Sequence, residues 1–399
     1  MELYWLWLSM LPGVGAQLQK KLLQRFGSPA DVYHAGEGEL LNMEGMGKTL
    51  TKRVLAARSL EEASRVQEKV RRCGALLLVF SDPLYPFMVK ELPHSPAVLY
   101  YRGTIREQSC GVGIVGARRC TAYGKEVARQ AATFLAKQGI PVISGMARGI
   151  DSYANTACLQ AGGYTLAFLG HGVDLCFPAD HRELMEAIVA QGAVISAYPP
   201  GTEAHPGFFP ERNYLISAWS YRLLVVEAAK KSGSLITARL AKEQGRPVLA
   251  VPDNIYKRES AGTNSLIAAG EASFYLHPSQ LLPETVLDAT GVKEREKIED
   301  EYSEHTGLEA TDGKGAFATL PAAGNENMPA APDPVSLPAL EQEILSLMID
   351  AGSPCSTEEL AVRFSGEKKL FWETLAVLVL EGKVENLPGG RVRPSACFS

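Results

Sequence analysis

The sequence predicts an α/β protein built on a mostly parallel sheet. Between residues 111 and 252, short and almost continuously apolar segments alternate with helical segments. Such apolar strands are typical of a parallel sheet that helices cover on both faces, which predicts a doubly wound, Rossmann-like fold. The expected strands are 114–116, 141–145, 164–170, 193–198, 222–228 and 247–252, and the expected helices are 123–138, 151–161, 181–190 and 234–243.

Charge and composition divide the chain into four parts. Residues 1–72 (11 basic, 8 acidic) and 73–283 (19 basic, 16 acidic) each carry a net charge of +3. Residues 284–335 carry −8 and lack periodicity, and residues 336–399 carry −3. We expect a helical domain, a sheet domain, an acidic disordered linker and a C-terminal domain, in that order. The overall charge of −5 is therefore due to residues 284–399, whereas residues 1–283 are mildly basic.

The N-terminal part contains two copies of a glycine-containing turn before a short amphipathic helix. The first copy is Leu-Pro-Gly-Val-Gly at 11–15, and the second is Gly-Met-Gly at 45–47. Such pairs resemble helix-hairpin-helix modules, in which glycines let backbone amides approach a DNA phosphate. A small helical packing domain without DNA contact is the alternative.

A strand, a proline-broken connection and a second strand, 98–102, lead into the sheet between residues 73 and 103. At the other end of the chain, helical segments at 338–350, 356–364 and 368–381 precede a β-hairpin, a pattern that resembles a winged helix. Winged helices often bind DNA, but the third segment is largely apolar or acidic. DNA binding and protein contact both remain open for this domain.

The composition disfavours several classes of protein. The seven cysteines are odd in number and never spaced C-x-x-C, so we expect neither a zinc site nor a disulfide framework. The apolar N-terminus contains Glu2 and is broken by Pro12 and Gly13, which disfavours an export signal or a membrane span. We therefore expect a cytoplasmic protein without a metal or cofactor.

The segment 111–124 contains a match to G-x-G-x-x-G that lies within the strand rather than after it. The next strand ends in Ser144 and Gly145, where a dinucleotide-binding protein has an acidic residue for the ribose, so NAD is disfavoured. Arg118, Arg119 and Thr121 follow the strand at the start of a helix. Two guanidinium groups, a hydroxyl and helix N-terminal amides suit a phosphate.

Two further segments repeat this chemistry. Arg148 follows the next strand, between Gly145 and Gly149, and Asp151 is placed to cap the following helix rather than to act as a catalytic acid. The segment 208–213 joins two phenylalanines to an Arg-Asn pair. Nucleic-acid bases stack on aromatic rings irrespective of sequence, although such phenylalanines are more often part of a core.

A third basic turn, Lys230-Lys231-Ser232-Gly233-Ser234, follows the strand 222–228 and opens a helix, and 262–264 offers a further contact through Asn264. One such loop is ordinary. Several along one sheet edge indicate a ligand with several phosphates in a row, and the simplest is single-stranded nucleic acid.

The segments VGARRCTAYG, SGMARGID, FLGHGVD, FPERN, the run from VVEAAKKSGSLITARL to VLAVP, and GTNSLI together resemble the DNA-processing protein A (Smf) family over residues 73–280. The resemblance implies a non-enzymatic, dimeric protein that binds single-stranded DNA and loads the RecA recombinase, notably in the natural transformation of competent cells. The predicted single-stranded-DNA-binding residues are Gly116, Arg118, Arg119, Thr121, Ser144, Gly145, Arg148, Gly149, Phe209, Arg212, Asn213, Lys231, Ser232, Gly233, Ser234 and Asn264.

The chain departs from the family pattern at four positions. Asn155 replaces His, Ala197 replaces Glu, Tyr214 replaces Arg and Asp253 replaces Gly. The change at Tyr214 removes a cation, so we expect either weaker DNA affinity or stacking in place of charge.

Two other functions are weighed against DNA binding. Phosphoribohydrolases, which are nucleotide N-glycosidases, share a related core but use a catalytic Glu at the helix that here begins near Ser232. No acidic residue occurs between Lys231 and Lys242, which disfavours that enzyme. A nucleotide-sensing regulator with the C-terminal domain as its effector is the third alternative.

Overall fold

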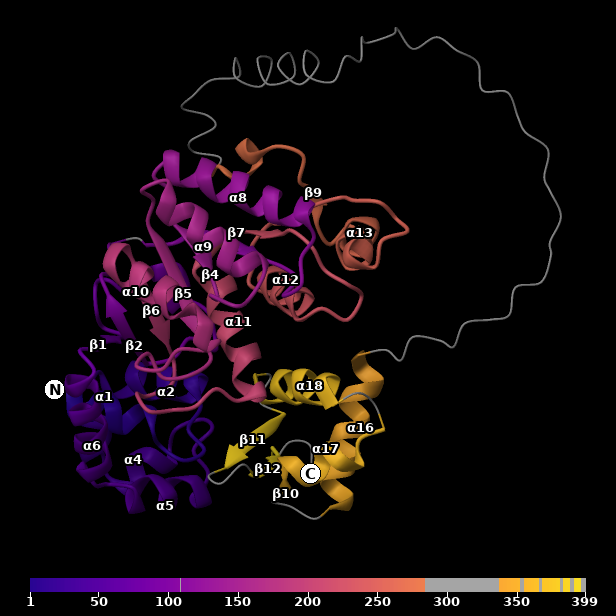
Figure 1. Cartoon of the computed structure of the whole chain (residues 1–399). Helices are drawn as coiled ribbons and strands as arrows, with labels where there is room; N and C mark the ends of the chain where they lie inside the picture. The colour runs from indigo at the N-terminus through magenta and orange to yellow at the C-terminus, as the bar shows by residue number, and fades with distance from the viewer. Residues whose placement is uncertain are drawn as a thin grey trace, which may run out of the picture. The chain divides into compact units, whose positions relative to one another are not determined.

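The structure is a computed structural model that describes residues 1–107, 109–283, 337–351, 355–365, 368–380, 383–387 and 391–395 (Figure 1). The chain divides into one compact unit of residues 1–281 and 340–399 and a second unit of residues 282–339. The predicted disordered linker, 284–335, lies outside the described residues.

The central element is a sheet that has nine strands in the described residues, in the order β1-β2-β6-β5-β4-β3-β7-β8-β9. The strands from β6 to β9 in this order are parallel, and β2 pairs antiparallel with both β1 and β6. This arrangement confirms the predicted α/β class with a mostly parallel sheet. The strands are β1 (Leu76–Val79), β2 (Val98–Gly103), β3 (Gly111–Val115), β4 (Val142–Ser144), β5 (Thr165–Leu169), β6 (Ala193–Ser196), β7 (Ser220–Val225), β8 (Val248–Ala250) and β9 (Ser273–Phe274).

Helices pack on both faces of this sheet. On one face, Ile143, Phe168 and Leu223 pack with residues of α11 and α12, and on the other, Val112 and Leu224 pack with residues of α8 and α9. Burial on both faces explains why the strands are apolar throughout. The helices of this region are α7 (Phe87–Lys90), α8 (Ala122–Lys137), α9 (Ile150–Gln160), α10 (Arg182–Gln191), α11 (Phe209–Ala218), α12 (Gly233–Glu243) and α13 (Ala261–Ala268), with 3₁₀ turns η1 (Ala179–His181), η2 (Pro206–Phe208), η3 (Arg258–Ser260) and η4 (Pro278–Leu281).

The N-terminal residues are helical. Trp5, Leu6, Trp7 and Leu8 of the first helix are buried and belong to the apolar core of this region. The predicted glycine turns precede the second and fifth helices; the helix-hairpin-helix interpretation stays a prediction. The helices are α1 (Glu2–Ser9), α2 (Ala16–Phe26), α3 (Pro29–His34), α4 (Glu37–Leu41), α5 (Lys48–Ala56) and α6 (Glu61–Arg72).

The C-terminal residues form helices and a small antiparallel sheet of order β10-β12-β11. Ile344, Phe371 and Val392 lie in a common apolar core. These are the elements expected of a winged helix, an interpretation that stays a prediction. They are α16 (Leu337–Asp350), α17 (Thr357–Arg363), α18 (Lys368–Leu380), β10 (Cys355–Ser356), β11 (Val384–Leu387) and β12 (Arg391–Pro394).

The order of the strands places a crevice next to β3. The chain runs outward from β3 through β4, β5 and β6, and then returns to place β7 on the opposite side of β3. At such a reversal the loops that follow the two neighbouring strands separate, and ligands of doubly wound sheets bind between them. The fold therefore directs attention to the turns after β3 and β7.

Candidate nucleic-acid interface

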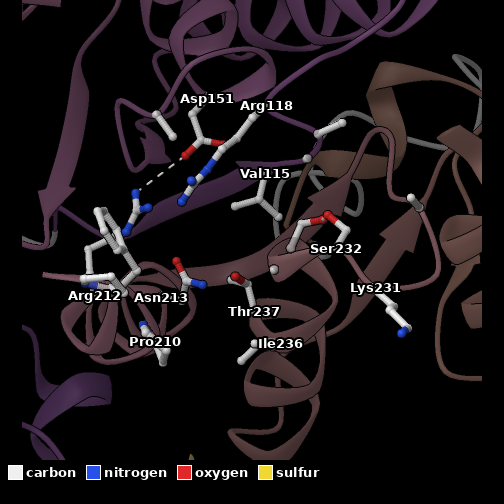
Figure 2. Close-up of a pocket in the computed structure, with 18 of the residues that line it drawn as sticks. Val115, Arg118, Asp151, Pro210, Arg212, Asn213, Lys231, Ser232, Ile236 and Thr237 are labelled. Atoms are coloured by element: carbon white, nitrogen blue, oxygen red, sulfur yellow. Dashed lines mark hydrogen bonds and ion pairs between the residues drawn. The ribbon is translucent and has the colours of Figure 1, made fainter. Parts of the chain in front are cut away.

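A pocket opens at the carboxyl ends of β3 and β7 (Figure 2). The predicted site residues that line it are Gly116, Arg118, Phe209, Arg212, Asn213, Lys231, Ser232, Gly233 and Ser234. The lining does not include Arg119, Thr121, Ser144, Gly145, Arg148, Gly149 or Asn264. The fold thus brings the turn after β3, the start of α11 and the start of α12 together around one pocket.

Two arginines lie close to the ring of Phe209, which is the first residue of α11. The guanidinium carbon of Arg118 is 5.4 Å from the ring centroid, and that of Arg212 is 5.5 Å from it. At these distances a guanidinium is attracted to the ring quadrupole, so Phe209 helps to hold both charges at the pocket. Arg118 is exposed, which leaves its donors accessible to a ligand.

Arg212 is buried, with 4% of its surface exposed. One of its terminal nitrogens donates to the carbonyl of Gly145 at 2.7 Å and lies 3.6 Å from a carboxylate oxygen of Asp151, the ion pair dashed in Figure 2. Burial lowers the pKa of Arg212 to about 10, so the side chain is still protonated at neutral pH. Its positive charge therefore contributes to the electrostatic potential of the pocket although the side chain is buried.

Asp151 lies in the first turn of α9 and is buried. Its carboxylate accepts the amide of Gly145 at 3.2 Å. Burial raises the pKa of Asp151, against the opposing effect of the Arg212 charge. The carboxylate thus holds the turn after β4 and the Arg212 side chain, and it does not cap α9, whose N-cap residue is Gly149.

The turn after β4 packs tightly against its neighbours. Ser144 is fully buried and donates its hydroxyl to the carbonyl of Ile114 at 2.7 Å. Gly149 has φ of +83°, and a side chain there would meet the carbonyl oxygen of Ala117 at 2.2 Å. A side chain at Gly145 would collide with the Arg212 guanidinium. These predicted site residues therefore join the turns after β3 and β4.

Thr121 is the N-cap residue of α8 and forms hydrogen bonds with the carboxyl group of Glu227, which follows β7. Its amide donates to Glu227 at 2.9 Å, its hydroxyl donates to the other Glu227 oxygen, and that hydroxyl accepts the amide of Gly124 at 3.2 Å. Glu227 is 1% exposed. The amide and hydroxyl that the sequence suggested for a phosphate are therefore already used by the carboxyl group of Glu227.

Arg119 and Arg148 are exposed outside the lining of the pocket. Arg148 pairs with Asp180 at 3.0 Å, and this hydrogen bond lowers the pKa of Asp180. The two side chains are 63% and 60% exposed, and ion pairs in water contribute little to stability. Arg148 can therefore exchange this partner for another anion at low cost.

The turn after β7 presents Lys230, Lys231 and the start of α12 to the pocket. Ser232 is the N-cap residue, and its hydroxyl lies 2.9 Å from that of Ser234. The first turn of α12 has no acidic residue, and Ser232 makes no side-chain capping bond. A helix start with adjacent lysines and hydroxyls is suited to an anion.

Asn264 does not face the pocket. Its amide nitrogen donates to the carbonyl of Asp253 at 2.9 Å, so it holds the loop after β8. Among the departures from the family pattern, Asn155 is buried and donates to Thr165 at 2.8 Å, and Tyr214 is 3% exposed and accepts the amide of His94 at 3.1 Å. Of the two alternatives for Tyr214, stacking on a base is contradicted, because its ring lies in the core, and weaker DNA affinity stays a prediction.

Three further residues belong to this region and were not identified from sequence. Phe177 and Arg258 line the pocket, and the Phe177 ring lies 6.1 Å from that of Phe209. Glu227 anchors Thr121 as described above. The Phe-Pro step at 177–178 and the basic pair at 257–258 are signals that could have indicated the first two. Among the described residues, no helix has the length and apolar character to cross a bilayer, and no group of three acidic, His or Cys side chains could hold a metal.

Comparisons with known proteins agree with this arrangement. Residues 76–285 match the family model described as DNA recombination-mediator protein A. Protein Smf of Synechocystis is 38% identical over 286 residues, which cover 70% of this chain and 72% of that protein. DNA processing protein DprA of Bacillus subtilis is 35% identical over 213 residues, which cover 53% of this chain and 72% of that protein.

A solved structure supports the same assignment. The X-ray structure of DNA processing protein A from Streptococcus pneumoniae is 27% identical, superimposes with a TM-score of 0.62, and is matched over 96% of its length by 70% of this chain. The family model spans the strands of the central sheet, from β1 to β9. This chain therefore belongs to the family of DNA recombination-mediator protein A.

Proposed function

We propose that this protein binds single-stranded DNA at the pocket between β3 and β7 and delivers it to the RecA recombinase. The observation that carries the proposal is the grouping of the exposed Arg118, the Lys230-Lys231 turn and the half-buried Phe209 at one sheet edge. The cations are suited to the phosphates of the strand, and the ring to an unpaired base.

Single-stranded DNA fits this edge better than duplex DNA does. Phe209 and Phe177 form an aromatic pair at the pocket, and bases reach such rings only when they are not paired inside a helix. Protein contacts to phosphates alone would not distinguish the two forms. The preference for single strands therefore depends on these rings, and the affinity for any strand depends on the cations.

A binding role suits the pocket better than the nucleotide N-glycosidase chemistry does. The first turn of α12 lacks the acidic residue that this chemistry requires. Asp151, Glu211 and Glu227 lie near the pocket, and each accepts a hydrogen bond from the protein itself. We therefore propose a non-enzymatic protein.

The test is a fluorescence-anisotropy titration of the full chain with a labelled oligothymidylate and with a duplex of the same length. We expect a preference for the single strand and a logarithmic slope of affinity against salt of about −0.7 per phosphate neutralised. Lys230→Ala/Lys231→Ala should weaken binding to all sequences alike, whereas Lys137→Ala, at the exposed far end of α8, should not. Equal affinity for duplex and single strand, or the absence of a salt dependence, would contradict the proposal.

RecA loading, a homodimeric state, a role in natural transformation and a cytoplasmic location rest on membership of the family. We propose them together with the domains 1–72, 73–283, 284–335 and 336–399, the first a helix-hairpin-helix module and the last a winged helix. An assay of RecA ATP hydrolysis on single-stranded DNA coated with a single-strand-binding protein tests the loading. Failure of this protein to stimulate hydrolysis, with DNA binding intact, would restrict its function to DNA binding.

A further inference from the structure

The loop between β8 and η3 exposes two large apolar side chains. Ile255 is 74% exposed and Tyr256 is 90% exposed. The loop begins at the carboxyl end of β8, the strand next to β7, and so lies at the sheet edge that carries the pocket. Two adjacent exposed apolar side chains beside a proposed binding site are candidates for contact with the ligand.

The loop is held in one conformation by hydrogen bonds that do not involve the Tyr256 ring. The Asp253 carboxylate accepts the amide of Asn254 at 2.7 Å and pairs with Lys257 at 3.1 Å. The Asn254 side chain accepts the amide of Tyr256 at 2.9 Å, and Ser260 donates its hydroxyl to the carbonyl of Asn254 at 2.7 Å. Tyr256 is therefore placed in solvent by a defined loop, which reduces the entropy that binding would cost.

The loop is connected to the proposed DNA site on two sides. Arg258, two residues after Tyr256, lines the same pocket as Lys230. The amide of Gly262, in the first turn of α13 after η3, donates to the carbonyl of Ala228 at 2.7 Å, in the turn that carries the lysines.

On the other side, the hydroxyl of Tyr123 lies 3.4 Å from the carbonyl of Pro252, at the start of the loop. Tyr123 is itself 44% exposed and belongs to the first turn of α8, after the arginine turn. Aromatic rings thus occur close to both cationic turns: Tyr123 follows the arginine turn, and Tyr256 belongs to the loop that precedes the contact with the lysine turn.

We propose that Tyr256, supported by Ile255, is a second base-stacking position for the DNA strand. The proposal rests on the single-stranded-DNA binding proposed above and extends it: the strand passes from Phe209 across the arginine and lysine turns to the β8 loop. Phe177, whose ring is 6.1 Å from that of Phe209, lies in the loop after β5. From that loop to the loop after β8 the path crosses four inter-strand spacings, which is about 19 Å and requires several nucleotides. Alternation of cations with aromatic rings is typical of surfaces that bind single strands without sequence preference.

The experiment compares wild type, Tyr256→Ala and Tyr256→Phe in full-length protein. Each is titrated with an oligothymidylate of about 16 nucleotides, long enough to cover an extended site, and with an abasic strand of the same length. Phe87→Ala is the matched control, because Phe87 is 77% exposed at the start of α7, outside the pocket lining.

We expect Tyr256→Ala to weaken oligothymidylate binding by about 5- to 30-fold, and Tyr256→Phe and Phe87→Ala by less than about twofold. On the abasic strand, Tyr256→Ala and wild type should bind equally, because phosphates remain and bases are missing. A strand carrying 5-iodouracil should form a photocrosslink to Tyr256 that peptide mass spectrometry identifies.

Three results would overturn the proposal. In the first, Tyr256→Ala binds oligothymidylate as tightly as wild type does, while Lys230→Ala/Lys231→Ala binds it more weakly. This result would contradict the stacking position and leave the proposed function intact. In the second, Tyr256→Ala changes the oligomeric state measured by sedimentation but not the affinity for DNA. This result would indicate that the loop contacts another protein chain instead of DNA. If wild type itself fails to bind single strands, the proposed function fails together with this inference.

Discussion

Two arginines lie at almost the same distance from the ring of Phe209 but in different environments. Arg118 is exposed, whereas Arg212 is 4% exposed and donates to the carbonyl of Gly145. The Arg118 guanidinium is accessible to a phosphate. The Arg212 guanidinium holds the turn after β4 in place, and its buried charge makes the pocket more positive. Two arginines that look alike in the sequence thus differ in what they can do: Arg118 is open to a ligand, whereas Arg212 supports the protein's own turn.

The largest expected difference between them is in stability. Arg212→Ala leaves the Asp151 carboxylate buried without its ion-pair partner, and the free energy of unfolding should fall by about 3–5 kcal/mol. Arg118→Ala, at an exposed position, should change it by about 0.5 kcal/mol or less. Urea unfolding followed by circular dichroism measures both, and losses of equal size would remove the distinction.

The turn that carries Arg118 should depend on Glu227. Glu227→Ala leaves the amide and hydroxyl of Thr121 without an acceptor in a mostly buried position, which should cost about 2–3 kcal/mol of stability. Glu243→Ala serves as control, because Glu243 is 52% exposed and pairs with Arg239 only at 3.8 Å. If Glu227→Ala were as stable as that control, the internal carboxylate would not be what holds the arginine turn.

Arg118→Ala should act on DNA affinity instead. Loss of one charge-assisted contact should weaken binding of single-stranded DNA by about 10-fold and reduce the salt slope by about 0.7. Arg72→Ala, which removes a 76% exposed arginine at the end of α6, is the control for net charge. An unchanged salt slope in the Arg118 variant would show that this guanidinium does not contact a phosphate.

The smallest expected effect is on the pH dependence of stability and concerns His171, whose pKa is influenced by the buried Arg212. His171 is 2% exposed; burial lowers its pKa, and the Arg212 charge lowers it further. Because the folded-state pKa lies below that of the unfolded chain, about 6.5, this contribution to stability is present above that pH and is lost as the pH falls. Urea unfolding from pH 7 to pH 5 should show a decline that His171→Asn makes shallower. Identical slopes would mean that His171 titrates normally.

Sequence reasoning predicted the strands of the sheet well and the helix α11 not at all. The strands were found because both of their faces are buried, which produces uninterrupted apolar runs. Helix α11 is buried around most of its circumference, with Pro210, Tyr214, Leu215 and Ile216 all in the interior. It therefore lacks the one-sided periodicity that indicates a helix.

The sequence by itself determined the α/β class and the concentration of glycines, hydroxyls and cations after the strands, because these are local patterns with a period or a fixed spacing. Only the tertiary structure decided which of those residues face the pocket. The partner of Thr121 is Glu227, 106 residues away, and the partner of Arg212 is Gly145, 67 residues away. Burial and pairing over such separations depend on how the strands are ordered in the sheet, which no local pattern specifies.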